Sequence, residues 1–158
     1  MRLSLVEVVL FLAAVAVAAT ALPRCSAGGK RAVVRASWSL TPGVLNPDVT
    51  QSTIASTICK HGWTRTIRPP VSYTNALKAE GVRRYRLRGP PSAFQEDHLI
   101  SLELGGHPTD PRNLWPEPYP RAAAVDQIEN DLNRRVCTGS LSLEDAQRRE
   151  SALKHADG

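Results

Sequence analysis

The sequence has few aromatic residues: three Trp, three Tyr and two Phe among 158 residues. A core built from so few large side chains depends on each tryptophan for its packing. We therefore expect Trp38, Trp63 and Trp115 to lie in the core rather than to serve as platforms for stacked bases. The length fits a single domain.

Cysteine is also rare. There are three, and no two stand in CxxC spacing, so the sequence gives no support to a zinc ribbon. Cys59 and Cys137 lie in two segments that each look structured, and we predict that they form a disulfide. Closing so long a loop contributes about 4 kcal/mol in the chain-entropy model. Cys25 is left over, either free or paired between chains.

Long apolar runs are absent except for residues 3–18, which follow a short basic start. This run is too short for a membrane span, and the small residues Ala19, Thr20 and Ala21 follow it. The pattern predicts a secretory signal peptide over 1–21, with an uncleaved anchor as the alternative. We therefore expect a secreted or periplasmic protein, with a flexible lead-in over 22–40 and one domain over 41–158.

The net charge is +5, which favours anionic partners, nucleic acid among them. Four arginines stand close together in the sequence: Arg83, Arg84, Arg86 and Arg88. Such a cluster binds phosphates without reading a base sequence. The alternative is that these charges serve only solubility.

Hydrophobic periodicity gives the expected elements. We predict a strand over 63–68, a helix over 73–80 that Gly81 ends, and a strand over 94–104. After a Gly-Gly turn, residues 113–115 form a short returning strand.

Two helices are predicted in the remaining chain. Residues 122–136 carry Val125, Ile128, Leu132 and Val136 at steps of three, four and four, which gives one apolar face. Ser142 and Asp145 resemble a capping box for a last helix, through about residue 154.

The most informative segment is 96–106 (EDHLISLELGG), followed after a loop by 113–116 (NLWP). An Asp-His pair, a Gly-Gly turn and an Asn-Leu pair in this order resemble the HNH, or ββα-metal, nuclease family. More narrowly, the chain resembles small exported bacterial proteins with an HNH-like core, in which a segment like 58–69 (ICKHGWTRTIRP) precedes the motif. The resemblance extends from about Thr41 to Gln147.

The resemblance implies an α+β fold. It would be a small, mainly helical domain with a hairpin-plus-helix (ββα-metal) core over 94–136, and we expect the disulfide to staple it. Neighbouring residues of a regular strand point to opposite faces. Asp97 and His98 can therefore share one site only where the strand bends or ends.

Phosphodiester hydrolysis accounts for the residue types in the hairpin. Asp97 is a hard oxygen ligand for a divalent cation, and a neutral His98 can take a proton from water near pH 7. In the family, the equivalent of Asn113 orients the histidine and ties the loop together. Mg²⁺ is the expected metal, with Mn²⁺, Ni²⁺ or Zn²⁺ as alternatives.

The helix after the hairpin departs from the family pattern. Relatives place a His or Asn ligand there, and a Lys-Asp pair followed by Glu, whereas Val125 stands at the lysine position in this chain. Asp126 and Glu129 remain, and either could bind the metal directly or through water; the alternative is a solvated helix face.

Two functions follow. The first is an exported, metal-dependent HNH-like endonuclease that cuts nucleic acid, with DNA as the expected substrate and little sequence specificity. The second is a non-catalytic, HNH-derived binding or interaction module at the cell surface. A third reading is an unrelated disulfide-stapled protein with a chance motif.

Overall fold

The computed structural model describes residues 33–119 and 121–158. The predicted signal peptide over 1–21 and the fate of Cys25 lie outside these residues. The part of the predicted lead-in that is described already packs against the domain. Ala36 is buried, and its backbone N–H donates to the carbonyl oxygen of Lys154 at 3.0 Å.

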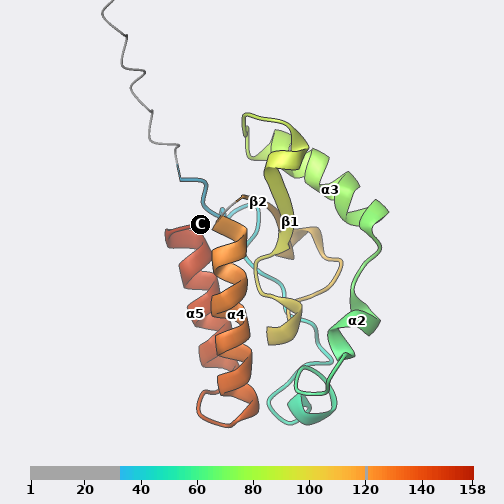
Figure 1. The fold of residues 1–158 in the computed structure, drawn as a ribbon, viewed down its shortest axis with the longest axis vertical. Coiled ribbons are helices and arrows are strands. Elements are labelled where there is room, and N and C mark those ends of the chain that lie inside the picture. The colour runs from blue at the N-terminus through green and yellow to red at the C-terminus, as the bar shows by residue number, and fades with distance from the viewer. Residues whose placement is uncertain (1–32, 120) are drawn as a thin grey trace, which may run out of the picture. The chain divides into compact units, whose positions relative to one another are not determined.

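The described chain is a small α+β fold, as predicted from the sequence (Figure 1). Its helices are α2 (Trp63–Ile67), α3 (Val71–Arg84), α4 (Arg121–Cys137) and α5 (Leu143–Ala156). The strands are β1 (Phe94–His98) and β2 (Leu114–Pro118). Short 3-10 turns are formed by Ile54–Ser56, Pro91–Ala93, Leu102–Leu104 and Pro111–Asn113.

β1 and β2 form an antiparallel hairpin whose two faces meet different helices (Figure 1). In its register Asp97 lies opposite Trp115, and Glu96 lies opposite Pro116. Paired residues share a face and neighbours alternate. The face with Asp97 is directed toward the α4–α5 pair, because Lys154 of α5 contacts this carboxylate. The face with Glu96 is covered by α3.

The packing of α3 explains why one predicted boundary is wrong. Gly81 does not end this helix, which continues to Arg84. A Cβ at Gly81 would lie 2.9 Å from the Cδ of Pro116, so the glycine allows α3 to approach the strand closely. Glycine can therefore serve close packing as well as helix termination.

The predicted strand over 63–68 is also wrong, because Trp63–Ile67 form the short helix α2. Gly62, with φ of 80°, reverses the chain just before it. An alternating pattern of six residues carries little information when the segment has no neighbouring strand to pair with.

The two C-terminal helices agree with the predictions. α4 buries one face, which includes Val125, Leu132 and Val136. The prediction for Ile128 is wrong, because this residue is exposed and Glu129 is buried instead. α5 begins after Ser142, whose hydroxyl accepts from the backbone N–H of Asp145 at 3.1 Å, as a capping residue does.

The tryptophans have different environments. Trp115 is fully buried, as predicted, and Trp63 is partly buried against the main core cluster. The prediction for Trp38 is wrong, because 64% of this residue is exposed. Its ring instead stacks on the ring of His155, with 3.5 Å between the centroids.

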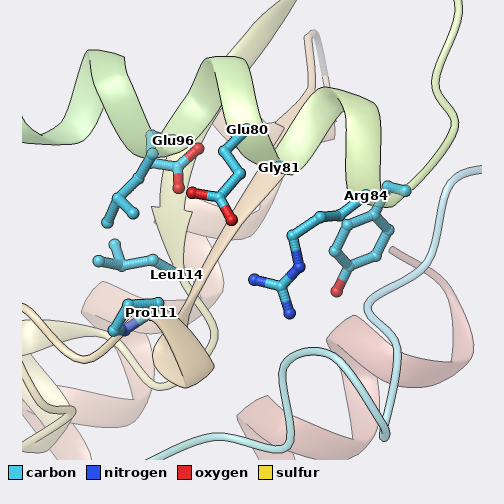
Figure 2. A pocket seen from close by; sticks show the side chains of 8 residues that line it. Glu80, Gly81, Arg84, Glu96, Pro111 and Leu114 are labelled. Carbon is cyan, nitrogen blue, oxygen red and sulfur yellow. The ribbon is translucent and has the colours of Figure 1, made fainter.

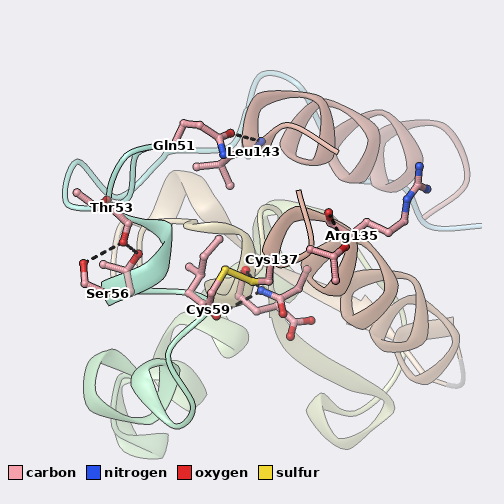
Figure 3. Close-up of a disulfide and its surroundings, with 12 residues drawn as sticks. Gln51, Thr53, Ser56, Cys59, Arg135, Cys137 and Leu143 are labelled. Atoms are coloured by element: carbon pink, nitrogen blue, oxygen red, sulfur yellow. Dashed lines mark hydrogen bonds between the residues drawn. A yellow bond between two sulfur atoms is a disulfide. The ribbon is translucent and has the colours of Figure 1, made fainter. Parts of the chain in front are cut away.

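The predicted disulfide between Cys59 and Cys137 is confirmed (Figure 3). It ties the loop before α2 to the last residue of α4, across 78 residues of chain. Nearby, the side chain of Gln51 accepts from the backbone N–H of Leu143 at 2.8 Å. Disulfides of this kind persist in oxidising compartments. None of the described helices is long and apolar enough to span a membrane.

Candidate functional site

His98 is the last residue of β1 and is buried, with 7% of its surface exposed. Its Nε2 lies 3.0 Å from the carbonyl oxygen of Pro108. A carbonyl can only accept, so Nε2 carries the hydrogen and Nδ1 is the basic nitrogen. No described residue forms a hydrogen bond with Nδ1. Burial is the main cause that lowers the pKa of His98 below its usual value, so the ring is neutral at pH 7.

Asp97, the predicted metal ligand, is bound by a buried lysine from α5. The Nζ of Lys154 lies 2.7 Å from Oδ2 of Asp97 and 2.6 Å from Oε1 of Glu129 on α4. It also donates to the backbone oxygen of His98 at 2.5 Å, and it lies 3.2 Å from Oε1 of Glu150. Two of the predicted metal ligands, Asp97 and Glu129, are therefore brought together around one ammonium group.

The charges of this cluster depend on one another. Burial works to raise the pKa of Asp97, but the charge and hydrogen bond of Lys154 outweigh burial, and the pKa is lowered. Burial likewise works to lower the pKa of Lys154, and the surrounding carboxylates, Asp97 first, hold it well above its usual value. Asp97 and Lys154 are thus an ionised buried pair.

Glu117 of β2 is a further buried acid on the same face as Asp97. Neither of its carboxyl oxygens has a hydrogen-bond donor among the described residues. Burial, followed by the charge of Asp97, raises its pKa to about 9. Glu117 is therefore protonated at neutral pH and adds no negative charge beside Asp97.

The other two carboxyls around the ammonium also favour the protonated form. Burial raises the pKa of Glu129 to about 9, although Lys154 acts in the opposite direction. Burial also raises the pKa of Glu150. The neighbourhood therefore holds more carboxyl groups than its single cation can neutralise.

Asn113 ties the loop beside His98 to the hairpin. The residue is fully buried, and its Oδ1 accepts from the N–H of Ile100 at 3.0 Å. Its Nδ2 donates to the carbonyl oxygens of Ile100 and His107, at 3.0 and 3.1 Å. Asn113 forms no hydrogen bond with the His98 ring among the described contacts, so it positions the histidine only through the loop.

The Gly-Gly pair allows this loop to close. A Cβ at Gly106 would lie 1.7 Å from the carbonyl oxygen of Ile100, so no other residue fits without moving the backbone. Gly105 has φ of 79°, in the left-handed region that favours glycine. Gly106 also forms an isolated antiparallel β-bridge with Leu45, in the segment before α2.

Asp126, the third predicted metal ligand, lies near the cluster without entering it. It has no direct contact with Lys154, and its side chain is half-buried beside Gln95. Burial, then the charge of Asp97, raises its pKa. Glu103 stands near it, with its pKa raised to about 7 by burial and then by the charge of Glu129.

The four predicted nucleic-acid contacts, Arg83, Arg84, Arg86 and Arg88, are all exposed. Arg83 and Arg84 are the last two residues of α3, and Arg86 and Arg88 lie in the connection to β1. Arg84 borders a small hollow between α3 and the hairpin, together with Glu80 and Glu96 (Figure 2). Burial raises the pKa of Glu96 to about 8.

Sequence reasoning missed the buried cation and its partners. In α5 the buried face runs through Leu143, Gln147, Glu150 and Lys154, at steps of four, three and four. Two charged residues therefore occupy positions where an amphipathic helix places apolar ones. This mismatch was the available signal, because charged residues are almost never fully buried unless they are paired.

Arg68 was also missed as a site residue. It is exposed at the C-terminal end of α2, and its charge acts on His98, Glu103 and Asp126. Arg68 belongs to the segment that carries the family resemblance, so its position in the sequence was the available signal.

The fit of a metal ion can be judged from the donor set. Oxygen donors, excess buried carboxyls and the two unpaired oxygens of Glu117 suit a hard divalent cation. As they stand, however, no three His, Cys, Asp or Glu side chains in the described ranges are placed to hold a metal ion together. Lys154 occupies the point where Asp97 and Glu129 converge.

The chain matches no family model, no curated protein and no solved structure. Its function is therefore inferred from the geometry of this site.

Proposed function

We propose that this chain is an exported HNH-like endonuclease that hydrolyses phosphodiester bonds of nucleic acid with little sequence specificity. The proposal includes the ββα-metal assignment for β1, β2 and α4. The observation that carries it is the state of His98: a neutral ring with Nε2–H fixed by Pro108 and Nδ1 left free to accept a proton. A general base needs this combination of position and protonation state.

The chain's own residues have separate roles in this proposal. His98 takes a proton from the attacking water at Nδ1, and the loop closed by Asn113 holds the ring through the carbonyl of Pro108. Asp97 and Glu129 would hold a divalent cation once the Lys154 ammonium has moved off their oxygens, and the cation would then neutralise charge on the phosphate and the leaving oxygen. Arg68 and the four arginines of the α3–β1 region bind backbone phosphates.

A nicking assay on supercoiled plasmid tests the function. We expect wild-type protein to nick DNA with Mg²⁺ or Mn²⁺ and to stop in EDTA. Replacing His98→Ala should lower the rate by about 10² to 10⁴, the usual contribution of a general base. His61→Ala is the matched control, because this exposed histidine lies outside the site. Metal-dependent nicking that survives His98→Ala would rule out the proposed role of His98.

A second candidate is a non-catalytic, HNH-derived binding module, and Lys154 favours it. An ammonium that already pairs with Asp97 and donates to Glu129 makes the scaffold independent of a metal. This candidate predicts no nicking with Mg²⁺, Mn²⁺, Ni²⁺ or Zn²⁺, together with salt-dependent binding of nucleic acid that Arg83→Ala or Arg86→Ala weakens.

A further inference from the structure

The Nζ of Lys154 lies among four oxygen atoms, as a metal ion would. Three are carboxylate oxygens, from Asp97 at 2.7 Å, Glu129 at 2.6 Å and Glu150 at 3.2 Å. The fourth is the backbone oxygen of His98 at 2.5 Å. Side-chain and backbone oxygens around one buried cation are the donor set of a hard divalent metal.

Several buried polar atoms near the ammonium have no hydrogen-bond partner among the described residues. Glu117 is fully buried beside Asp97, and neither of its oxygens has a donor among the described residues. Oε2 of Glu150 and Oγ of Ser101 are likewise buried and unpaired there. Unpaired buried polar atoms are costly, so these oxygens remain available to a further ligand.

We infer that Lys154 occupies a divalent-cation site formed by Asp97, Glu129 and Glu150, and that its ammonium keeps the metal out. The lysine is an internal cation, delivered by α5 to carboxylates of β1 and α4. A divalent ion binds these oxygens only when the Lys154 side chain has left them.

The cluster opens to solvent on the side of Asp97 and Glu129, whose side chains are each 10% exposed, whereas Lys154 and Glu150 are at 0%. Asp126 and Glu103 are two further carboxyl groups near that side.

This inference shares one element with the proposed function, which is that Asp97 and Glu129 are the residues that would hold the metal ion. Its test measures metal binding rather than cleavage. Wild-type protein that does not nick DNA would remove the endonuclease, and tighter metal binding by Lys154→Ala would still support the inference.

The test is a titration of purified protein with Ca²⁺ and Mn²⁺ by calorimetry, with Mn²⁺ also followed by electron paramagnetic resonance. Lys154→Ala removes the ammonium and opens the space, so we expect at least ten-fold tighter binding of both ions than in wild type. Lys154→Met removes the charge but keeps the bulk, and it should bind more weakly than Lys154→Ala. Lys60→Ala, which removes an exposed lysine, should match wild type.

Two results would overturn the inference. One is a Lys154→Ala protein that binds neither ion more tightly than wild type does. The other is tight binding by wild type that Asp97→Asn abolishes, because the site would then be open with Lys154 present. If Lys154→Ala unfolds in metal-free buffer, 10 mM Ca²⁺ must restore its circular dichroism, and failure to do so counts against the inference.

Discussion

At the scale of single residues, the site depends on side chains that each form hydrogen bonds with several neighbouring groups. Asn113 closes three hydrogen bonds to the backbone of Ile100 and His107 from one buried amide. Neither a carboxylate nor an aliphatic side chain can both accept and donate in this way. The position of the loop, and with it the orientation of His98, therefore depends on one side chain.

Replacing Asn113→Ala should lower the free energy of unfolding by about 3 kcal/mol, because it leaves the buried N–H and carbonyl of Ile100 without partners. Asn130→Ala is the control, since this exposed asparagine makes one hydrogen bond, to the carbonyl of Asp126. Urea denaturation followed by circular dichroism measures both. Equal losses in the two variants would show that Asn113 does not hold the loop.

At the scale of elements, the sequence predicted those segments whose signals are local. The period of α4, the Ser142 cap of α5 and the Gly-Gly turn each act within a few residues. The elements that were missed depend on distant partners. α2 replaced a predicted strand that had nothing to pair with, and Gly81 stays helical because Pro116 lies against it.

The candidate site likewise has a part that a local motif predicts and a part that depends on a distant contact. The placement of Asp97 and His98 on the first strand of the hairpin follows from a local motif. The predicted bounds are wrong, because β1 ends at His98 rather than at Leu104, and Asn113 ends a 3-10 turn rather than beginning the second strand. The cation that neutralises Asp97 arrives from α5, 57 residues later. No spacing rule within the motif indicates it, because the contact is made only when α5 packs against α4 and the hairpin.

The disulfide is the clearest energetic link between elements. Replacing Cys59 and Cys137 together by Ser should lower the free energy of unfolding by about 4 kcal/mol, because the unfolded chain loses a closure of 78 residues. Denaturation with and without reductant checks this prediction. A wild-type protein whose urea midpoint is unchanged by reduction would contradict it, and the double variant should be insensitive to reductant in any case.

At the scale of the whole molecule, buried acids set the dependence of stability on pH. Burial raises the pKa of Glu96 to about 8 and that of Glu117 to about 9, whereas an unfolded Glu titrates at 4.5. The folded state therefore keeps protons that the unfolded state has released, and stability falls as pH rises through this window. His98 has the opposite effect on stability: burial lowers its pKa, so below pH 6.5 the unfolded state binds a proton more readily and stability rises with pH.

We therefore expect the melting temperature to fall between pH 6.5 and pH 9, by about 5 °C or more for a domain of this size. Glu117→Gln keeps a hydrogen-bond donor beside Asp97 but cannot ionise, so its decrease should be smaller than that of wild type. Glu144→Gln, which changes an exposed acid of α5, should reproduce the wild-type decrease. Scanning calorimetry at both pH values measures the three proteins, and a melting temperature that rises with pH would contradict the assignment.

The link between Asp97 and Lys154 also sets an order of events during biosynthesis. A ribosome adds about 5–20 residues per second, so Asp97 is made roughly 3 to 11 s before the lysine that neutralises it. During that interval Asp97 and its neighbouring acids have no internal counterion and remain hydrated. The hairpin is thus a late-maturing part of the molecule, completed by the arrival of the final helix rather than by its own short-range contacts.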